Sequence, residues 1–465
     1  MKKFFGFALV LGLSLMGIGC GSNSPSQISL SQSASVFVTG EDAPLSSVVG
    51  FSLTLNSVTL NEQGGGTATL ITSPTTVDFA RLLGLRSPLA FNTVTPGTYT
   101  SATFVVANPV ISYIDMTQNP PALNTYAGAL PQNPNSITVN FPAPMVVASN
   151  GLAGLKMELD IRKSISLDAN GQIVLNASGQ AIVTPVIYAK ATKASDPDGE
   201  VTDLMGGLVS VSVANNSFVL QGPYGRQLTI YVNGNTQFNS GWNINNLAAP
   251  AFVAVQGRFQ ADGSLLASGV EVVTTSHSFV SGRVLQVGTS GSGNLQVTMW
   301  IGETGADMVS WVDTIQTIDI NAVTQYDICF MDNPFTNALF SSTSIEVGQR
   351  IFIGGSFVNS VFTPAMISLR RQGMYGTLDV GHVTITNGNT GNFLLNNNGL
   401  VGFSVGGPVT VNTFNGTFFF NLTGLSQLQS ETTAIPLVTR GLLLKDPISG
   451  TTQFYAGLVA DPQGN

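Results

Sequence analysis

Four carboxylate side chains stand close together in a short polar stretch of this 465-residue chain. Their spacing resembles a calcium-binding loop, because hard divalent cations prefer several carboxylate oxygens supplied by one segment. The match is partial, since glycine stands at the fourth place of the run and no glutamate stands at the twelfth. A solvated acidic linker explains the same cluster, and we favour that interpretation. The residues are Asp196, Asp198, Glu200 and Asp203.

Aromatic side chains suggest a second kind of chemistry, because an aromatic face can stack on a sugar ring. Tryptophan in a β-domain more often packs in the core or at its rim, so the sequence leaves both roles open. The candidates for ligand binding are Tyr231, Trp242, Trp300 and Trp311.

Catalytic machinery is scarce in the sequence. His277 and His382 are the two histidines, too few and too dispersed for a histidine-based zinc site. No P-loop, no Gly-x-Gly-x-x-Gly fingerprint and no Gly-x-Ser-x-Gly elbow occurs. Two carboxylates from anywhere in the chain can form a glycosidase pair, but no pair stands out. We therefore predict a protein that is not an enzyme, with no catalytic residues, no metal and no cofactor.

Short strands that recur in three copies would position these side chains. An opening glycine recurs at Gly207, Gly282 and Gly376, at intervals too long for a solenoid repeat, so we predict separate small domains in series. Runs rich in Val, Ile, Leu and Phe between Asn, Gly and Asp turns predict the strands of the first copy. These are Leu208–Val213, Ser217–Leu220, Leu228–Val232, Phe252–Phe259 and Leu265–Val272.

A second landmark supports the repeat. Val255-Gln-Gly-Arg-Phe259 is answered by Ile353-Gly-Gly-Ser-Phe357 and by Val438-Thr-Arg-Gly-Leu442. Through Asn216–Leu220 and Thr236-Gln237-Phe238, the first copy resembles domain of unknown function 5666, a family of small OB-like bacterial β-barrels. The resemblance implies a barrel, and it brings no catalytic residues with it. An OB-like barrel hosts many functions, so the fold alone does not predict one. The third copy lacks a clear Thr-Gln-Phe segment and is the divergent one.

The region before the repeats predicts a β-sandwich. Val49–Leu60 alternates apolar and polar residues as a strand does, and Val77–Leu85 is predicted as a short helix that Asp78 caps or braces. With Pro96-Gly-Thr-Tyr-Thr100 and Val38-Thr-Gly-Glu-Asp-Ala-Pro44, the region resembles domain of unknown function 4382, an N-terminal β-sandwich of exported bacterial proteins.

The N-terminus predicts export and lipidation. Two lysines precede the apolar stretch Phe4–Ile18, which is too short to span a bilayer as a stable helix. It leads to Cys20 through small residues that resemble the lipobox of bacterial lipoproteins, and a polar tether follows. We predict that lipid on Cys20 holds the protein at a membrane. An ordinary signal peptide that contains a cysteine, or a retained helical anchor, is the alternative.

Composition agrees with an exported β-protein. Charged residues make up 9% of the chain, against about 25% in typical soluble domains. The formal net charge of −8 argues against nucleic acid as a partner, because phosphates require a basic surface. If Cys20 carries lipid, Cys329 has no disulfide partner, and we predict that it is a small buried apolar residue.

We therefore predict an all-β protein, a β-sandwich followed by about three small OB-like barrels in tandem. It is expected to be a lipid-anchored cell-envelope protein at the outer membrane or cell surface. Its expected role is non-catalytic binding or adhesion to a glycan, a protein or another envelope partner. A structural spacer or a subunit of an envelope assembly is the alternative, and a glycan-active enzyme comes third. The predicted domains are a signal peptide at 1–19, a tether at 20–33, the sandwich at 34–193, a linker at 194–205, and barrels at 206–275, 279–371 and 373–465.

Overall fold

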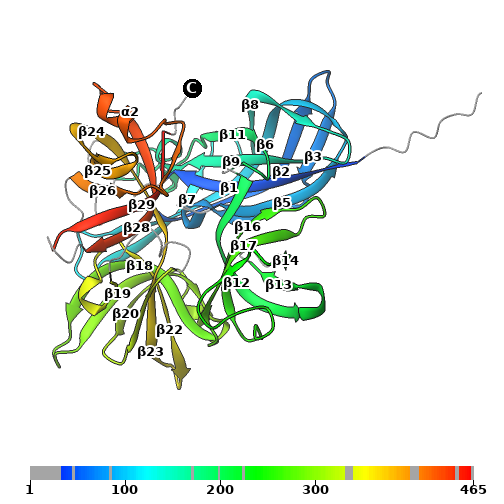
Figure 1. Cartoon of the computed structure of the whole chain (residues 1–465). Helices are drawn as coiled ribbons and strands as arrows, with labels where there is room; N and C mark the ends of the chain where they lie inside the picture. Colours follow the sequence, from blue (N-terminus) through cyan, green and yellow to red (C-terminus); the bar gives the residue numbers. More distant parts are fainter. Residues whose placement is uncertain are drawn as a thin grey trace, which may run out of the picture.

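The chain forms one β-sandwich and three β-barrels, as the sequence predicts. Strands account for 63% and helices for 7% of the computed structural model, which therefore has an all-β fold built from tandem sheet domains. Figure 1 shows the sandwich in blue and cyan and the barrels in green, yellow and orange to red. The structure describes residues 33–43, 48–82, 86–168, 172–196, 199–222, 226–329, 339–397, 408–445 and 450–461.

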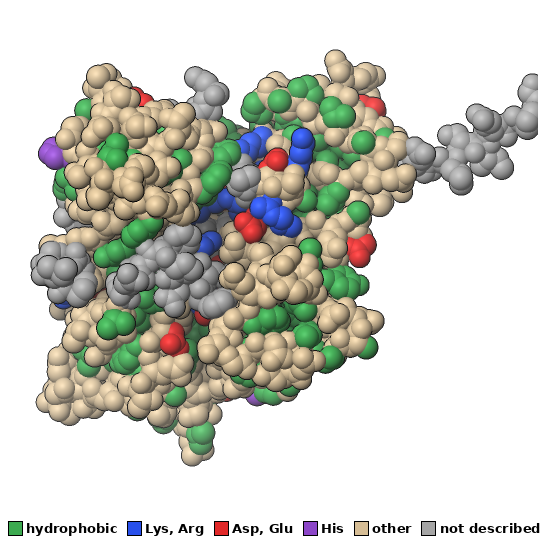
Figure 2. Space-filling view, viewed as in Figure 1, with side chains coloured by type: hydrophobic (Ala, Val, Ile, Leu, Met, Phe, Trp, Pro, Cys, Tyr) green, Lys and Arg blue, Asp and Glu red, His purple; other side chains and the backbone are tan. Residues whose placement is uncertain are grey.

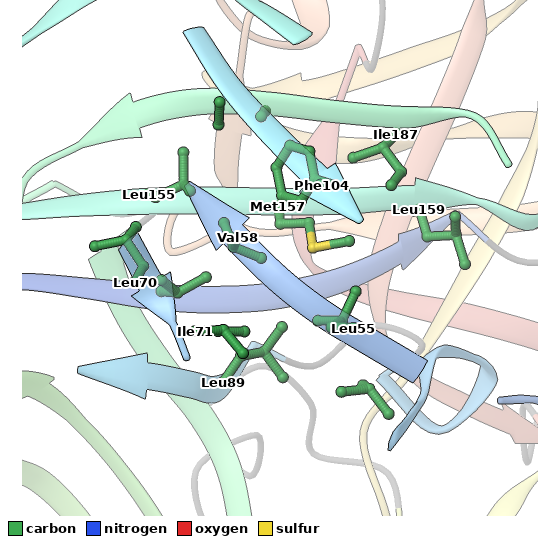
Figure 3. Close-up of a cluster of buried hydrophobic side chains, with 14 of the residues drawn as sticks. Leu55, Val58, Leu70, Ile71, Leu89, Phe104, Leu155, Met157, Leu159 and Ile187 are labelled. Atoms are coloured by element: carbon green, nitrogen blue, oxygen red, sulfur yellow. The ribbon is translucent and has the colours of Figure 1, made fainter. Parts of the chain in front are cut away.

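Two sheets face each other in the sandwich. The smaller has the order β11-β9-β1-β5, and the larger runs β10-β7-β6-β2-β3 with β4 on β2 and β8 on β6. Their apolar faces form one core (Figure 3). The bounds are β1 Ala34–Ala43, β2 Val48–Glu62, β3 Thr67–Ile71, β4 Thr75–Asp78, β5 Ser87–Val94, β6 Gly97–Asp115, β7 Ala122–Ala129, β8 Asn135–Val147, β9 Leu152–Asp160, β10 Ala181–Ile182 and β11 Ile187–Thr192, with the short helix α1 at Ile161–Ser164.

Strand β2 shows how the sequence pattern sets the core. Phe51 and Leu55 are fully buried at even spacing, as a strand with one inward face requires. The ladder to β6 then shifts register between Leu55 and Ser57. This shift moves the inward positions by one residue, so Val58 is also fully buried. A β-bulge therefore explains the break in the alternation.

The helix predicted over Val77–Leu85 is mostly wrong. The chain continues as strand β4 to Asp78, and only Phe79–Leu82 forms a single 3-10 turn, while residues 83–85 lie outside the described part of the chain. The Asp78 carboxylate accepts a hydrogen bond from the Phe51 backbone N–H and one from Arg81 Nε, each at 2.8 Å. Asp78 therefore braces the turn against β2, which is one of the two roles predicted for it.

The three barrels share one strand order. In the first it is β14-β13-β12-β16-β17-β15, and the second and third repeat it strand for strand. Pairing of β14 with β17, and of β26 with β29, closes five strands into a ring in the first and third barrels. The bounds are β12 Glu200–Ser212, β13 Ser217–Gln221, β14 Gln227–Tyr231, β15 Gln237–Phe238, β16 Phe252–Phe259, β17 Leu265–Thr274; β18 Ser278–Thr289, β19 Leu295–Thr304, β20 Thr314–Asp319, β21 Gln325–Ile328, β22 Arg350–Val358, β23 Val361–Leu369; β24 Gln372–Asn387, β25 Thr390–Asn396, β26 Pro408–Thr413, β27 Phe418–Phe420, β28 Pro436–Lys445 and β29 Thr452–Ala460, with α2 at Leu425–Ser430.

The third barrel is a true copy of the first. Thr236 of the first barrel accepts the Asn233 N–H and donates to the Ala267 carbonyl oxygen. Thr417 of the third barrel makes the same two bonds, from the Phe414 N–H and to the carbonyl oxygen of Ala456. The third barrel therefore has a counterpart of Thr236-Gln237-Phe238, which the sequence alone did not reveal. In it, Phe418–Phe420 follows Thr417 in place of Gln-Phe.

The repeated glycines stand where strands cross closely. A Cβ at Gly282 or Gly376 would overlap a carbonyl oxygen on the paired strand, and so would one at Gly206. Gly207 has open space around its Cβ position, so the predicted landmark is wrong by one residue in the first copy. Glycine recurs at these three places because the backbones leave no room for a side chain.

Glycines of the second landmark mark β-bulges. The ladders shift register at Gly257, Gly355 and Gly441, once in each barrel. At each of these positions a Cβ would meet the carbonyl oxygen of the opposite strand. The bulge bends the strand so that the sheet can curl into a barrel.

Aromatic contacts join the first barrel to both neighbours. Phe37 of β1 stacks on Phe259 of β16, with ring centroids 4.8 Å apart. Phe279 of β18 packs against Phe252 of β16 and Phe352 of β22, at centroid distances of 4.3 and 4.9 Å. Buried apolar contacts of this kind fix the angle between domains, whereas a polar interface leaves domains free to move.

The third barrel packs back on the sandwich, so the four domains form a closed ring (Figure 1). The Arg162 guanidinium of the sandwich lies 3.5 Å from the ring centroid of Tyr375 on β24. Glu41 on β1 forms an ion pair at 2.6 Å with Lys156 and a second one with Arg440 of β28. The barrels are therefore arranged around the sandwich and are not an extended string.

The linker predicted over 194–205 is shorter in the structure. Strand β12 begins at Glu200, pairs with β16, and buries Leu204 and Met205. Its polar residues are not solvated throughout, because Asp203 is only 3% exposed. The boundary before the third barrel is buried as well, since Arg370 has no exposed surface.

Candidate ligand cleft between the first two barrels

A cleft of about 570 Å³ lies between the first and second barrels. One wall is the chain after β15 together with strand β17, and the other is formed by β21 and β23. The volume falls within the range of about 300–1,000 Å³ that is usual for small-molecule pockets. The lining residues are Asn239, Ser240, Trp242, Glu271, Val272, Val273, Thr274, Thr275, Gln325, Asp327, Ile328, Met366 and Ser368.

Trp242 is the predicted sugar-stacking residue that lines this cleft. The backbone N–H of Trp242 donates to the carbonyl oxygen of Asn239 at 3.1 Å, which closes a turn after β15. The Asn239 side chain exchanges two hydrogen bonds with the backbone of Val272 on β17, at 3.0 and 3.1 Å. The indole is partly buried against the core of the first barrel and is therefore held in one place at the cleft wall.

The other three aromatic candidates do not line the cleft. Trp300 is 6% exposed and packs among apolar side chains between the sandwich and the second barrel. Trp311 contacts Phe357 and Phe362 edge-on, with centroids 5.9 and 6.0 Å away. Tyr231 ends β14, half-buried within the first barrel. The packing role left open by the sequence therefore describes Trp300 and Trp311.

Hydrogen-bonding groups face Trp242 from the second barrel. Gln325 and Asp327 stand two residues apart on β21, so their side chains share one face of the strand. Gln325 Nε2 donates to Asp327 Oδ2 at 2.5 Å, which orients both groups. Ser240 and Thr275 add hydroxyl groups from the first barrel. Besides Asn239 and Glu271, which are bonded to the protein, the cleft thus offers an aromatic face, hydroxyls, the Gln325 amide and the Asp327 carboxylate.

A buried ion network adjoins the cleft through Glu271, which lines it. Arg370 follows β23 and donates from Nη1 to Glu271 at 2.8 Å and from Nη2 to Asp203. Arg350 also donates to Asp203, at 2.9 Å, and the Cys329 thiol lies 3.6 Å from Glu271. The network itself is buried, and the charged side chains that Figure 2 shows at the hollow between the domains are others that reach the surface. The network joins the first barrel to the second.

The pKa values of the two carboxylates in this network are shifted in opposite directions. Burial alone would raise the pKa of Asp203, but the charges of Arg370 and Arg350 outweigh burial and hold that pKa below its usual value. Burial raises the pKa of Glu271, and the single arginine beside it offsets only part of this effect. Asp203 is therefore the principal counter-ion of the arginine pair.

The three described carboxylates of the calcium-loop hypothesis do not converge. Asp196 accepts a hydrogen bond from its own turn, at the Lys193 N–H, and Glu200 lies 3.7 Å from Arg258. Asp203 points into the protein and binds arginine, and Asp198 lies outside the described residues. Within the described ranges, no group of three or more His, Cys, Asp and Glu side chains is arranged to hold a metal.

Sequence reasoning missed the ion network, although two signals were available. Glu271 interrupts the apolar run Val270–Val273, where an unpaired carboxylate would be costly. Arg370 follows Ile367–Leu369 at the end of a buried strand. Each charged residue inside an apolar run implies a partner of opposite sign, but neither run identifies that partner. The predicted buried state of Cys329 is confirmed, since its exposed fraction is 1%.

Two family descriptions match the chain. Residues 33–177 match "Domain of unknown function (DUF4382)" and residues 206–271 match "Domain of unknown function (DUF5666)", in the predicted order. No curated protein matches the chain. One solved structure found by the comparison is titled "Crystal structure of tetra-tandem repeat in extending region of large adhesion protein"; it is 11% identical over 92% of this chain and 98% of that chain, with a TM-score of 0.09. Among the described residues, no helix is long and apolar enough to cross a membrane.

Proposed function

We propose that this chain, a DUF4382 domain followed by a DUF5666 domain and two further barrels, is a non-catalytic glycan-binding protein of the cell envelope. The ligand site is the cleft between the first two barrels. The proposal depends on one observation above all, the position of Trp242 opposite hydrogen-bonding side chains in a cleft of about 570 Å³.

Sugar chemistry fits this lining. A pyranose presents hydroxyl groups, which both donate and accept hydrogen bonds, and an apolar C–H face, which packs on an aromatic ring. Trp242 supplies the ring, while Gln325, Asp327 and Ser240 supply donors and acceptors. The volume leaves room for one or two sugar units. An anionic ligand fits less well, because the lining residues include the carboxylates of Glu271 and Asp327 and neither lysine nor arginine.

The pairing of both carboxylates in the cleft supports a non-catalytic role. Arg370 holds Glu271, and Gln325 donates to Asp327, so each carboxylate already has a positioning partner. The ring of domains favours a rigid binding site over the alternative of an extended spacer, because the third barrel returns to the sandwich and adds no reach.

Lipid on Cys20 is the proposed anchor, and this residue lies outside the described part of the chain. Each buried methylene of an acyl chain contributes about 0.8 kcal/mol, so several chains together hold a protein at a membrane surface. We expect intact mass spectrometry of envelope-extracted protein to find an acylated terminus at Cys20, and a Cys20→Ser variant to lose the lipid. An unmodified terminus at another residue contradicts the anchor and leaves the binding proposal unaffected.

Screening on immobilised glycans tests the binding proposal. The mature protein, kept in mild detergent, should be retained on a subset of neutral oligosaccharides, and free sugar of the same type should elute it. Retention that persists in high salt supports contacts by stacking and hydrogen bonds, since salt screens charge–charge attraction. A defined oligomer that retains no glycan would contradict the proposal and favour the structural alternative.

A further inference from the structure

A second cavity lies where the sandwich meets the first two barrels. Its volume is about 270 Å³, near the lower end of roughly 300 Å³ for small-ligand pockets. The ion network separates it from the cleft, because Glu271 lines the cleft, Asp203 lines this cavity, and Arg370 binds both. Nothing proposed above uses this cavity.

Its lining carries more positive than negative groups. Four arginines face three carboxylates around the cavity. Two of these carboxylates have arginine partners: Asp78 binds Arg81 at 2.8 Å, and Asp203 binds Arg350 at 2.9 Å. Outside the lining, Asp313 also binds Arg81 at 2.9 Å and Glu41 lies 3.9 Å from Arg86, so the anion site is assigned to the side of Arg283 and Arg350. The lining arginines are Arg81, Arg86, Arg283 and Arg350, and the carboxylates are Asp78, Asp203 and Glu303.

Glu303 is the third carboxylate, and burial disfavours its charged form. Within the described part of the chain, the Glu303 side chain has no hydrogen bond and no ion pair. Burial raises the pKa of Glu303, and the more distant charges of Arg350 and Arg81 offset only part of this rise. Arginine stays charged in proteins, and the pKa of Arg283, lowered by burial and by Arg350 to about 10, remains well above neutral pH. Protonation of Glu303 therefore increases the positive excess.

Two hydrogen-bond donors on residues that line the cavity lack a strong acceptor. Trp300 Nε1 is buried, and no described residue accepts from it. Arg350 Nη2 has the Met205 sulfur at 3.4 Å, and a thioether is a weak acceptor. A buried donor without an acceptor is costly, so the cavity favours an occupant that accepts hydrogen bonds.

Apolar side chains complete the walls. Leu82 of the sandwich, Leu204 and Met205 of the first barrel, and the Trp300 ring of the second barrel line the cavity beside the charged groups. Contact between water and apolar side chains is unfavourable. A ligand with a short apolar body would therefore bind more favourably by covering these side chains.

We propose that this junction cavity binds a small organic anion with a short apolar body, of the short-chain carboxylate class. Its anionic end lies among Arg283, Arg350 and the Trp300 N–H, and its body lies against the leucine side chains. Binding anion beside Glu303 requires that carboxyl to be protonated. The site therefore takes up a proton with the ligand, and affinity rises as pH falls.

The groups that face Glu303 agree with this direction. They are Arg81 and Asp78 from the sandwich, Asp203 from the first barrel, and Arg283, Arg350 and Arg370 from the second barrel. Asp203 has a lowered pKa and stays ionised down to pH values below the usual aspartate range. Asp78 has a pKa raised by burial, so its protonation on acidification adds to the positive excess.

Fluorescence of Trp300 tests the proposal directly. In full-length protein with Trp242→Phe and Trp311→Phe, Trp300 is the remaining tryptophan and lines the cavity. Butyrate should change its emission saturably in the millimolar range, more strongly at pH 5.5 than at pH 7.5. Butylammonium, which has the same apolar body and the opposite charge, should give no saturable change at equal ionic strength.

Two variants sharpen the test. Glu303→Gln removes the like charge while keeping the size, and should tighten butyrate binding about tenfold at neutral pH and flatten its pH dependence. Glu431→Gln, a change outside the cavity, should leave butyrate affinity unchanged. Equal responses to butyrate and butylammonium overturn the proposal. So does the absence of a saturable response to either ligand, which is the result expected of a cavity that holds only water. If Glu303→Gln fails to fold, the comparison of the two ligands and the pH dependence still decide.

Discussion

Replacing Arg370 with methionine is expected to lower the free energy of unfolding by about 3–5 kcal/mol. Arg370 has no exposed surface and is bound by both Asp203 and Glu271. Methionine fills much of the same volume but leaves two carboxylates in a buried site, where Arg350 alone remains to pair with Asp203. An uncompensated buried charge is costly, whereas a neutral site of the same shape is not.

Denaturant unfolding followed by circular dichroism measures this effect. Arg258→Met is the matched control, because the Arg258 side chain is 37% exposed and lies 3.7 Å from its carboxylate partner. It also donates to the backbone oxygens of Ala194 and Asp196, so about 1–2 kcal/mol should be lost. Adding Asp203→Asn and Glu271→Gln to Arg370→Met should restore much of the stability, since all three charges are then absent. Equal losses for Arg370→Met and Arg258→Met would contradict the central role of the network.

Gly206→Ala is expected to destabilise the protein by about 3 kcal/mol, while Gly207→Ala, one residue further on, should change stability by less than about 1 kcal/mol. The Cβ of alanine at Gly206 would overlap the carbonyl oxygen of Gln221 on β13, and rigid backbone cannot move aside cheaply. At Gly207 no heavy atom lies within 4 Å of the new Cβ.

Thermal and denaturant unfolding of the two variants side by side gives the comparison. The pair holds the substitution, the strand and the sequence neighbourhood constant, so the difference isolates contact with the opposite backbone. The same change at Gly282 or Gly376 should repeat the loss seen at Gly206, because those glycines occupy the same place in the other barrels. If Gly207→Ala costs as much as Gly206→Ala, the assigned equivalence of the three glycines is wrong.

Local pattern predicted four strands of the first barrel closely, whereas β12 begins at Glu200 and not at the predicted Leu208, and β15 was not predicted. The predicted strand Phe252–Phe259 coincides with β16, because turn-forming residues flank this apolar run on both sides. The helix over Val77–Leu85 was wrong because Val77 and Phe79 are buried two residues apart, which is the strand period, before the single turn begins. Periodicity in so short a segment cannot separate the two structures.

Long-range pairing was beyond the sequence. The bonds from Arg370 to Asp203 and from Arg350 to Asp203 join residues 167 and 147 positions apart. No local pattern specifies which arginine meets which carboxylate, so Asp203 was assigned to a solvated linker. The cleft depends on the same long-range pairing, because its walls belong to different barrels. The sequence therefore identified Trp242 as one of four aromatic candidates but could not show that it lines a cleft.

Calorimetric titration of a retained oligosaccharide into three tryptophan variants tests the central claim, that the cleft binds sugar through Trp242. Trp242→Ala should weaken binding about tenfold, or about 1.4 kcal/mol, and Trp242→Phe should keep most of the affinity because an aromatic face remains. Trp311→Ala should bind as the unmodified protein does, since Trp311 packs against Phe357 and Phe362 away from the cleft. Unchanged affinity in Trp242→Ala, or an equal loss in Trp311→Ala, would contradict the claim.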